Sequence, residues 1–255
     1  MPHRARKESS TGVYHVFVRG INHELIFNQT REKCYFKKII KKHLIKYDIE
    51  IYAYCIMSSH AHFIIKSQDI QEMSMFMSKV LAEYASYYNY KKNRNGHVFQ
   101  GRFRSECIED SHYYWTCLKY IHMNPVKAHM VSAAWEYRYS SINDYKNERT
   151  NIIHENGIKQ YKQKFANWQQ FMEYHYGRNA SIFLGMEQEV YLQQKDMAWD
   201  ILYEMQALEE VEHVREVLEE PEMRKRYLNL LKERMQISET KKKKLYEEIK
   251  KELLL

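Results

Sequence analysis

Two kinds of apolar pattern alternate along the first part of the chain. Short segments of alternating or continuous apolar residues predict β-strands, because successive side chains of a strand point to opposite faces. The predicted strands are Val13–Arg19, Glu50–Met57, His60–Lys66 and Arg102–Glu109. Longer segments with apolar residues every three or four positions predict amphipathic helices. These helices run from Arg31 to about Tyr47, from about Gln71 to Tyr90, and from a cap at Asp110 or Ser111 to about Asn124.

The order strand, helix, strand, strand, helix, strand, with a further helix after it, predicts an α+β, ferredoxin-like fold. In this fold the helices pack on one face of an antiparallel sheet, and we expect the other face to be free for a ligand. Pro125 is expected to end the third helix, because proline disfavours helical geometry in the residue before it. From about Gln160 the pattern is mostly helical. We therefore expect a domain of residues 1–150 and a mostly helical C-terminal extension of residues 151–255, whose role the sequence does not indicate.

Charge is distributed unevenly between these two parts. Residues 1–149 hold 23 Lys and Arg against 14 Asp and Glu, whereas the remainder holds 17 against 19. Ten of the 13 histidines also precede residue 150. A basic region rich in His and Tyr suits a polyanion such as nucleic acid, although solvated lysines alone would give the same count. We also expect the lysine run 241–244 to be a solvated helix face.

The cysteines and the hydropathy of the chain exclude several classes of protein. The four cysteines are widely spaced and form no CxxC pair, so we expect reduced, mostly buried residues and not a disulfide framework or a zinc knuckle. They are Cys34, Cys55, Cys107 and Cys117. No apolar run reaches transmembrane length, and the basic amino terminus lacks an apolar segment. We expect a cytoplasmic protein without a membrane span or a secretory signal.

His60 and His62 are the first candidates for chemistry. They are separated by one residue in a predicted strand, so both imidazoles should project from the same face, in a geometry that can hold one metal ion. Such a pair also arises by chance and is weak evidence alone. Downstream, Tyr120 and Asn124 are four residues apart and therefore neighbours on one helix face. With 22 tyrosines in the chain, a packing role for Tyr120 is the competing interpretation.

Two histidines, an amide and a phenol together suit phosphoryl transfer. A divalent ion polarises the phosphate and helps to neutralise charge as the phenolate attacks. Such a ligand set leaves coordination positions open for phosphate oxygens, which favours Mg²⁺ or Mn²⁺ over a closed structural zinc site. A zinc hydrolase or a structural zinc protein is less favoured, because no acidic residue adjoins the histidine pair and no cysteine pair lies near it.

Several short motifs follow one another in a specific order. They are Tyr14-His15-Val16 with Arg19-Gly20, Ile26-Phe27, Tyr54 to Met57, His60-Ala61-His62, Val98 to Phe103, Tyr120 to Ala128, and Tyr139-Ser140-Ser141. In this order, roughly residues 10–145 resemble the REP-associated tyrosine transposases, which belong to the single-tyrosine HUH insertion-sequence transposases. One departure is Ser58-Ser59, where members of the family commonly carry Pro-Asn before the first histidine.

The resemblance implies that residues 1–150 are an HUH transposase-like catalytic domain. Such an enzyme is a metal-dependent DNA transposase and endonuclease that cleaves and rejoins single-stranded DNA near hairpins. By position, the resemblance implies that His60, His62 and Asn124 bind the metal, Mg²⁺ or Mn²⁺. It implies that Tyr120 is the nucleophile, which forms a 5′-phosphotyrosine and releases a 3′-hydroxyl.

Residues that contact DNA are also implied. The resemblance places Arg19, Arg102 and Arg104 near the DNA, and their guanidinium groups suit phosphate. Phe99 is expected to stack on an unpaired base, with packing in the core as the alternative. The implied partner is single-stranded, hairpin-containing DNA derived from repeats, in the nucleoid of the cytoplasm, and a homodimer is one arrangement that the resemblance allows.

A second hypothesis belongs to a different class of function. The chain could be a non-cleaving DNA-binding regulator derived from such a transposase. Retention of His60, His62, Tyr120 and Asn124 favours the enzyme. The sequence leaves open the target DNA, the physiological metal, and whether the tyrosine acts with the metal of its own subunit or of a partner.

Overall fold

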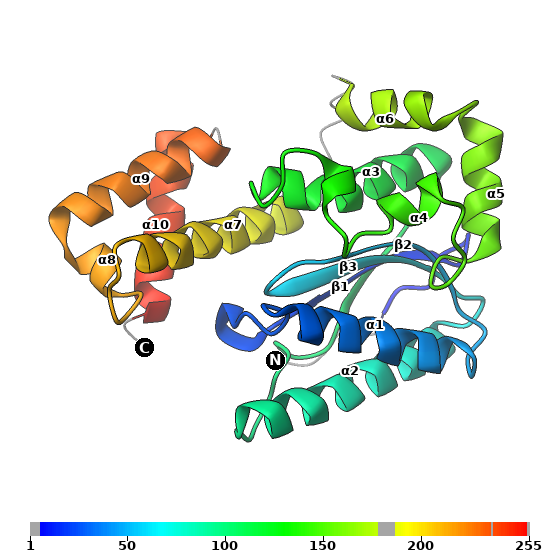
Figure 1. Ribbon diagram of the computed structural model, residues 1–255, viewed down its shortest axis with the longest axis horizontal. Coiled ribbons are helices and arrows are strands. Elements are labelled where there is room, and N and C mark those ends of the chain that lie inside the picture. Colours follow the sequence, from blue (N-terminus) through cyan, green and yellow to red (C-terminus); the bar gives the residue numbers. More distant parts are fainter. Residues whose placement is uncertain (1–5, 178–186, 236, 254–255) are drawn as a thin grey trace. The chain divides into compact units, whose positions relative to one another are not determined.

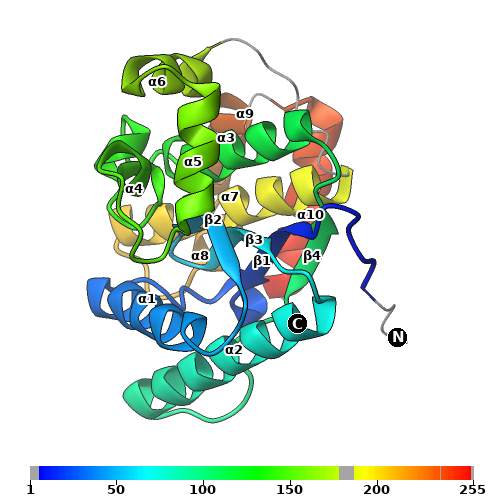
Figure 2. The same cartoon turned by 90° about the vertical axis from the view of Figure 1, so that its right-hand side faces the viewer.

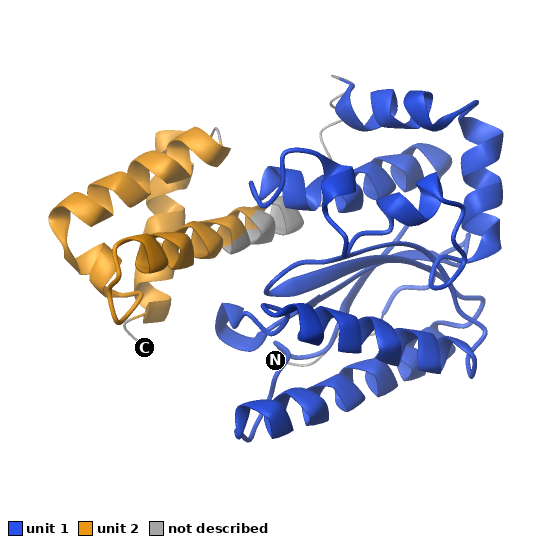
Figure 3. Ribbon diagram, viewed as in Figure 1, with its two compact units in different colours: residues 1–183 blue, residues 184–255 orange. Residues whose placement is uncertain are grey.

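A computed structural model of the chain describes residues 6–177, 187–235 and 237–253. The chain divides into two compact units, residues 1–183 and 184–255 (Figure 3). The sequence places the start of the extension at residue 151, whereas residues 151–177 contribute to the core of the first unit. Buried side chains from this segment include Tyr161, Phe165 and Phe171.

The first unit is built around a four-stranded antiparallel sheet with the strand order β2-β3-β1-β4 (Figure 1). Its strands are β1 (Val13–Arg19), β2 (Glu50–Ile56), β3 (His60–Lys66) and β4 (Arg104–Cys107). Helices connect β1 to β2 and β3 to β4, which confirms the ferredoxin-like fold. On β1, Phe17 lies opposite His62 of β3 and Arg104 of β4. Because directly paired residues point to the same face, these three side chains share one side of the sheet.

Helices cover both faces of this sheet. One face packs against α1 (Thr30–Leu44) and α2 (Ile70–Lys92), as Figures 1 and 2 show. On this side the rings of Phe36 and Phe63 have centroids 6.3 Å apart. The opposite face, which the sequence pattern left open, is partly covered by α3 (Ser111–Lys127), over β2 and β3. This placement brings the helix that carries Tyr120 onto the histidine face.

The helix α3 continues beyond the point predicted from the sequence. The prediction that Pro125 ends it is wrong, because α3 passes through Pro125 and reaches Lys127. A proline lacks its own backbone N–H, but the residues after it can still donate. The N–H of Ala128 donates to the carbonyl of Asn124 at 2.9 Å, so the last turn is closed.

The segment after α3 returns to the sheet. It comprises the 3₁₀ turn Ala134–Glu136, then α4 (Ile142–Lys146), α5 (Glu155–Lys164) and α6 (Trp168–Tyr176). Before α4, Ser140 and Ser141 are buried. The N–H of Ile56 donates to Tyr139 at 3.0 Å, and that of Ser141 donates to Tyr54 at 2.9 Å. The segment therefore pairs with β2.

The described secondary structure of the second unit is all helical, as the sequence predicts. Its helices are α7 (Glu187–Leu208), α8 (Glu216–Glu219), α9 (Pro221–Met235) and α10 (Glu239–Leu253). They enclose an apolar core of their own, which includes Leu202, Tyr227, Leu231, Leu245 and Ile249. None of the described helices of the chain is long and apolar enough to span a bilayer.

All four cysteines are free thiols. Cys55 and Cys117 are buried, but Cys34 is exposed and Cys107 is half-buried. The expectation of mostly buried cysteines therefore holds for two of them, and the expectation of reduced residues holds for all four.

Candidate active site at the histidine strand and the tyrosine helix

His60 and His62 project from the same face of β3, as strand geometry predicts. Their ring centroids are 5.1 Å apart and the rings are nearly perpendicular, at 86°. Both side chains are buried under the elements that cover this face. Nδ1 of His60 lies 3.0 Å from the Ser59 hydroxyl, which fixes the orientation of its ring. The turn Ser58-Ser59 therefore supplies a partner to the first histidine.

A third histidine, His15 of β1, holds the ring of His62. Nε2 of His15 lies 3.1 Å from Nδ1 of His62, and the two rings are stacked. Burial lowers the pKa of His62 well below its ordinary value and that of His15 to about 4, so both imidazoles are neutral near pH 7. Across the sheet, Glu106 of β4 lies opposite His15, and its charge opposes the lowering of the His15 pKa. His15 thus acts as an orienting neighbour of the His62 ring.

Tyr120 lies against this cluster. Its hydroxyl is 3.4 Å from Nε2 of His62, and the two rings meet edge to face with centroids 5.3 Å apart. The side chain is only 3% exposed, because α3 lies directly on the sheet. The helix begins at Ser111 and is capped by the carboxylate of Asp110, one of the two caps that the sequence predicts. Lys127 follows Asn124 by about one helical turn, and its Nζ lies 5.0 Å from the centroid of the Tyr120 ring.

Asn124 follows Tyr120 by one helical turn. Its side-chain nitrogen Nδ2 is buried and has no hydrogen-bond partner among the described residues. A buried amide with an unused polar atom is unusual, because such groups are nearly always paired. Within the described ranges, no three His, Cys, Asp or Glu side chains come together as a metal cluster. Of the three expected metal ligands, the structure brings His60 and His62 together. Asn124 would have to contribute its amide oxygen, because an amide nitrogen donates hydrogen bonds and does not bind a cation.

The residues expected to contact DNA line one small pocket beside the histidines. Its lining includes Phe17 together with Arg19, Phe99, Arg102 and Arg104. The ring centroid of Phe17 lies 4.8 Å from that of His62, so this pocket adjoins the histidine cluster. The structure therefore brings the four residues together at one pocket. Arg19, paired with His60, and Arg104, paired with Phe17, lie on the histidine face of the sheet, whereas Phe99 packs toward α2.

These four side chains differ in accessibility. Arg19 is buried, and its Nε donates to the side chain of Gln100 at 2.7 Å. Phe99 is half-buried and packs toward Tyr84, with ring centroids 6.0 Å apart. Arg102 and Arg104 are exposed, and no carboxylate of the described residues forms an ion pair with either of them. These two guanidinium groups are the ones available to phosphate.

Comparison with protein families gives a match to one family, described as "Transposase IS200 like", over residues 8–124. This segment belongs to the IS200-like transposase family. All eight residues singled out from the sequence lie within the transposase segment, and Asn124 is its last position.

Two solved structures are similar to the chain. One is described as the structure of the REP-associated tyrosine transposase bound to a REP hairpin. Its sequence is 19% identical to this chain, and the TM-score is 0.49. The alignment covers 58% of this chain and 87% of that chain. The other is a crystal structure from Deinococcus radiodurans R1, described provisionally as a transposase. Its sequence is 12% identical to this chain, and the TM-score is 0.34. The alignment covers 47% of this chain and 95% of that chain. With both TM-scores below 0.5, we draw nothing about function from them. No curated protein matches the chain.

Three neighbours of this candidate site were missed by the sequence reasoning. His15 and Glu106 pair across β1 and β4, and Lys127 lies in the turn of α3 beyond Pro125. The alternation of β1 places His15 on the same face as Phe17 and Arg19, so His15 could have been found once the pairing of β1 with β3 was known. Lys127 was missed because the helix was expected to end at Asn124, before this residue.

Proposed function

We propose that the chain is a metal-dependent tyrosine transposase and nuclease that cleaves and rejoins single-stranded DNA near hairpins. The observation that carries the proposal is the approach of the Tyr120 hydroxyl to His62, within a segment of the IS200-like transposase family. A buried phenol beside a pair of neutral imidazoles is the arrangement that a tyrosine nucleophile next to a metal site needs. The hairpin target comes from the resemblance of the motif order.

In this proposal Tyr120 forms a covalent bond to DNA. The phenolate oxygen attacks the phosphorus of one phosphodiester, the bond from phosphorus to the 3′-oxygen breaks, and a 5′-phosphotyrosine forms. The phenolic proton goes to solvent, and the departing 3′-oxygen takes a proton from solvent, so the step is balanced. Attack by a 3′-hydroxyl on the phosphotyrosine reverses the step and rejoins the strand. Lys127, over the ring of Tyr120, favours the negatively charged phenolate.

His60, His62 and Asn124 would hold the divalent ion, Mg²⁺ or Mn²⁺. When bound, the ion supplies polarisation of the scissile phosphate and neutralisation of its developing charge. The low pKa of His62 keeps its imidazole unprotonated and able to donate a lone pair. Ser59 and His15 keep the two rings in place through their hydrogen bonds to His60 and His62.

Single-stranded DNA would approach along the side of the sheet that carries Arg104 and Phe17. Arg102 and Arg104 would bind phosphates, and the buried side chain of Arg19 would form part of the pocket wall. Phe99 offers a partly exposed ring at the same pocket, where an unpaired base could stack. The net excess of Lys and Arg in residues 1–149 adds a field that attracts a polyanion.

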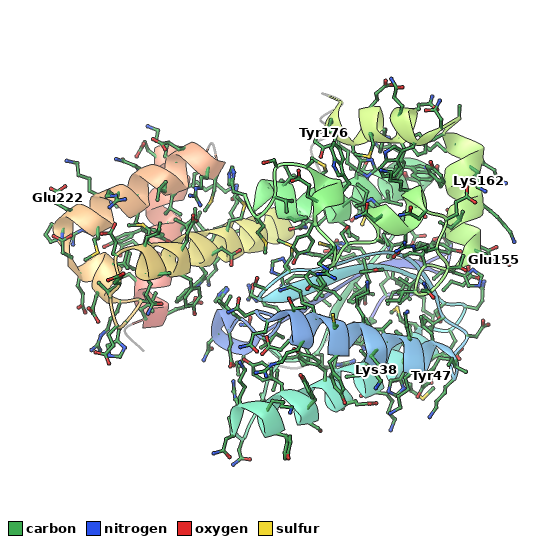
Figure 4. The ribbon with its side chains drawn as sticks, viewed as in Figure 1. Lys38, Tyr47, Glu155, Lys162, Tyr176 and Glu222 are labelled. Atoms are coloured by element: carbon green, nitrogen blue, oxygen red, sulfur yellow. The ribbon has the colours of Figure 1, made fainter. Side chains whose placement is uncertain are left out.

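The test is a covalent-adduct assay. Purified protein is mixed with a panel of single-stranded oligonucleotides that carry a hairpin next to an unpaired segment, with Mg²⁺ or Mn²⁺. We expect strand cleavage and a protein–DNA adduct that survives denaturation. Tyr120→Phe should lose the adduct and keep DNA binding. A matched control is Tyr47→Phe, since Tyr47 follows α1 (Figure 4) and packs on Phe76 of α2, on the face of the sheet opposite His60 and His62.

Two results would contradict the proposal. An adduct that persists in Tyr120→Phe would remove this tyrosine as the nucleophile. Hairpin binding without any cleavage by the wild-type protein, with either metal, would favour the non-cleaving DNA-binding regulator.

A further inference from the structure

A directional chain of hydrogen bonds lies behind α3, outside the site described above. Nδ1 of His122 on α3 lies 3.0 Å from Nε2 of His175 on α6, and Nε2 of His122 lies 2.8 Å from the Ser141 hydroxyl. The chain continues from Nδ1 of His175 to the carbonyl of Phe171 at 2.7 Å. At the other end, the N–H of Tyr54 on β2 donates to the Ser141 hydroxyl at 2.9 Å. The side chains of His122, His175 and Ser141 are at most 1% exposed.

The direction of both hydrogen bonds made by His175 can be deduced. The carbonyl of Phe171 can only accept, so Nδ1 of His175 carries the proton and donates. In a neutral ring Nε2 of His175 then accepts, and Nδ1 of His122 must donate to it. Nε2 of His122 faces the Ser141 hydroxyl, which also lies 3.2 Å from the carbonyl of Tyr54. The ring of His175 is neutral near pH 7, because burial lowers its pKa to about 4.

This chain connects four parts of the first unit: β2, the segment before α4, α3 and α6. On α3, His122 is two residues from Tyr120, and at about 100° per residue it points to nearly the opposite side of the helix. A second bond joins the same two helices, since Nζ of Lys119 donates to the carbonyl of Gly177 at 3.0 Å. Residues 125–177, which supply Ser141 and His175, lie beyond the segment matched to the transposase family.

Hydrogen bonds of fixed direction constrain a helix differently from apolar packing. An apolar contact lets α3 slide or rotate by a fraction of an ångström at small cost, whereas a buried N–H that moves away from its acceptor loses its only partner. Position matters here, because the Tyr120 hydroxyl lies 3.4 Å from His62 and a misplacement of about 1 Å can cost about 100-fold in rate. We propose that His175 is a positioning residue, which through His122 sets the rotation and height of α3 and thus the placement of the Tyr120 hydroxyl. This inference rests on the proposed function.

Two substitutions of His175 separate positioning from packing. His175→Phe keeps an aromatic ring among Phe171 and its neighbours but leaves the His122 N–H without an acceptor. His175→Gln keeps an oxygen that can accept from His122 and an N–H₂ that can donate to Phe171. A packing control is Ile158→Ala on α5, which weakens the same core without touching the chain of hydrogen bonds. Thermal unfolding of each variant establishes that it is folded at the assay temperature.

Two readouts are taken on the full-length protein. The first is the single-turnover rate of adduct formation, with the DNA dissociation constant measured separately. We expect His175→Phe to lower the rate by about 10- to 100-fold with little change in DNA affinity, and His175→Gln to recover most of the loss. The second is the ¹⁹F resonance of a 3-fluorotyrosine incorporated at position 120, measured without DNA. It should shift in His175→Phe, return toward the wild-type position in His175→Gln, and stay in place in Ile158→Ala.

The ¹⁹F readout keeps this inference separable from the proposed function. If the resonance of residue 120 does not move in His175→Phe, or moves equally in Ile158→Ala, the positioning role is refuted even where the wild-type protein forms its adduct. If the wild-type protein forms no adduct but the resonance moves and is rescued by His175→Gln, the proposed function fails and the control of Tyr120 by His175 stands. A rate that falls equally in all three variants would also refute the inference.

Discussion

At the scale of single residues, the site depends on neutral, buried imidazoles. His62 faces His15 on one side and the Tyr120 hydroxyl on the other, and both contacts are made by ring nitrogens. Desolvation is the largest cause of the lowered pKa of both histidines, ahead of neighbouring charges. Both imidazoles are therefore neutral near pH 7, the state that the proposed metal ligand His62 requires.

Loss of His15 should weaken the response to metal. His15→Phe retains the ring shape but removes the hydrogen-bond partner of His62, and such outer partners typically change metal affinity or activity by about 10- to 100-fold. We expect the Mn²⁺ concentration that gives half-maximal cleavage to rise within that range. The control His112→Gln alters an exposed histidine in the first turn of α3 and should leave the metal response unchanged. An unaltered Mn²⁺ titration in His15→Phe would exclude an orienting role for His15.

At the scale of elements, the sequence predicts the framework well and its surroundings less well. The strands and helices up to Asn124 follow from local apolar patterns, and the face shared by His60 and His62 follows from the two-residue period of a strand. The position of α3 over that face, and the role of Pro125 inside it, depend on tertiary packing. The hydrogen-bond partner of His122 is His175 on α6, which is 53 residues away in the sequence. Local apolar patterns do not predict contacts at such a separation. The sequence therefore predicts the grouping of His60, His62 and Tyr120, but not the residues that hold their rings in place.

Acid should destabilise the first unit through these buried histidines. The pKa of His175 falls from 6.5 in an unfolded chain to about 4 in the fold, so between these values the unfolded state binds the proton and the folded state does not. Its contribution to stability is present above pH 6.5 and is lost as the pH falls toward 4; for one such group the loss is about 3 kcal/mol. We expect the free energy of unfolding in urea to drop between pH 7 and pH 5. The drop should be smaller in His175→Gln, and an equal drop would contradict this assignment.

At the scale of the whole molecule, the two units have separate apolar cores and different charge. The first unit contains the transposase segment and an excess of Lys and Arg, whereas Asp and Glu outnumber Lys and Arg in the second unit. The sequence predicted this asymmetry and the helical character of the second unit. It did not predict that α5 and α6 belong to the first unit, because their apolar residues resemble those of any amphipathic helix until their packing partners are known.

DNA binding should respond to salt through Arg102 and Arg104. For single strands the logarithm of the binding constant falls with the logarithm of salt concentration by about 0.7 for each phosphate contact, so the variant Arg102→Gln/Arg104→Gln should lower the slope by about 1.4. The control Lys38→Gln/Lys41→Gln removes the same charge from α1, on the other face of the sheet (Figure 4). Equal slopes for the two double variants would show that the phosphates are bound elsewhere.

The central claim is that the Tyr120 oxygen becomes bonded to DNA. The most direct measurement is mass spectrometry of peptides from the denatured adduct, after nuclease trimming of the DNA to a short nucleotide. The account predicts a nucleotide attached through its 5′-phosphate to Tyr120, with a free 3′-hydroxyl on the released strand. A nucleotide on any other residue of the wild-type protein, or an attachment through a 3′-phosphate, would contradict it.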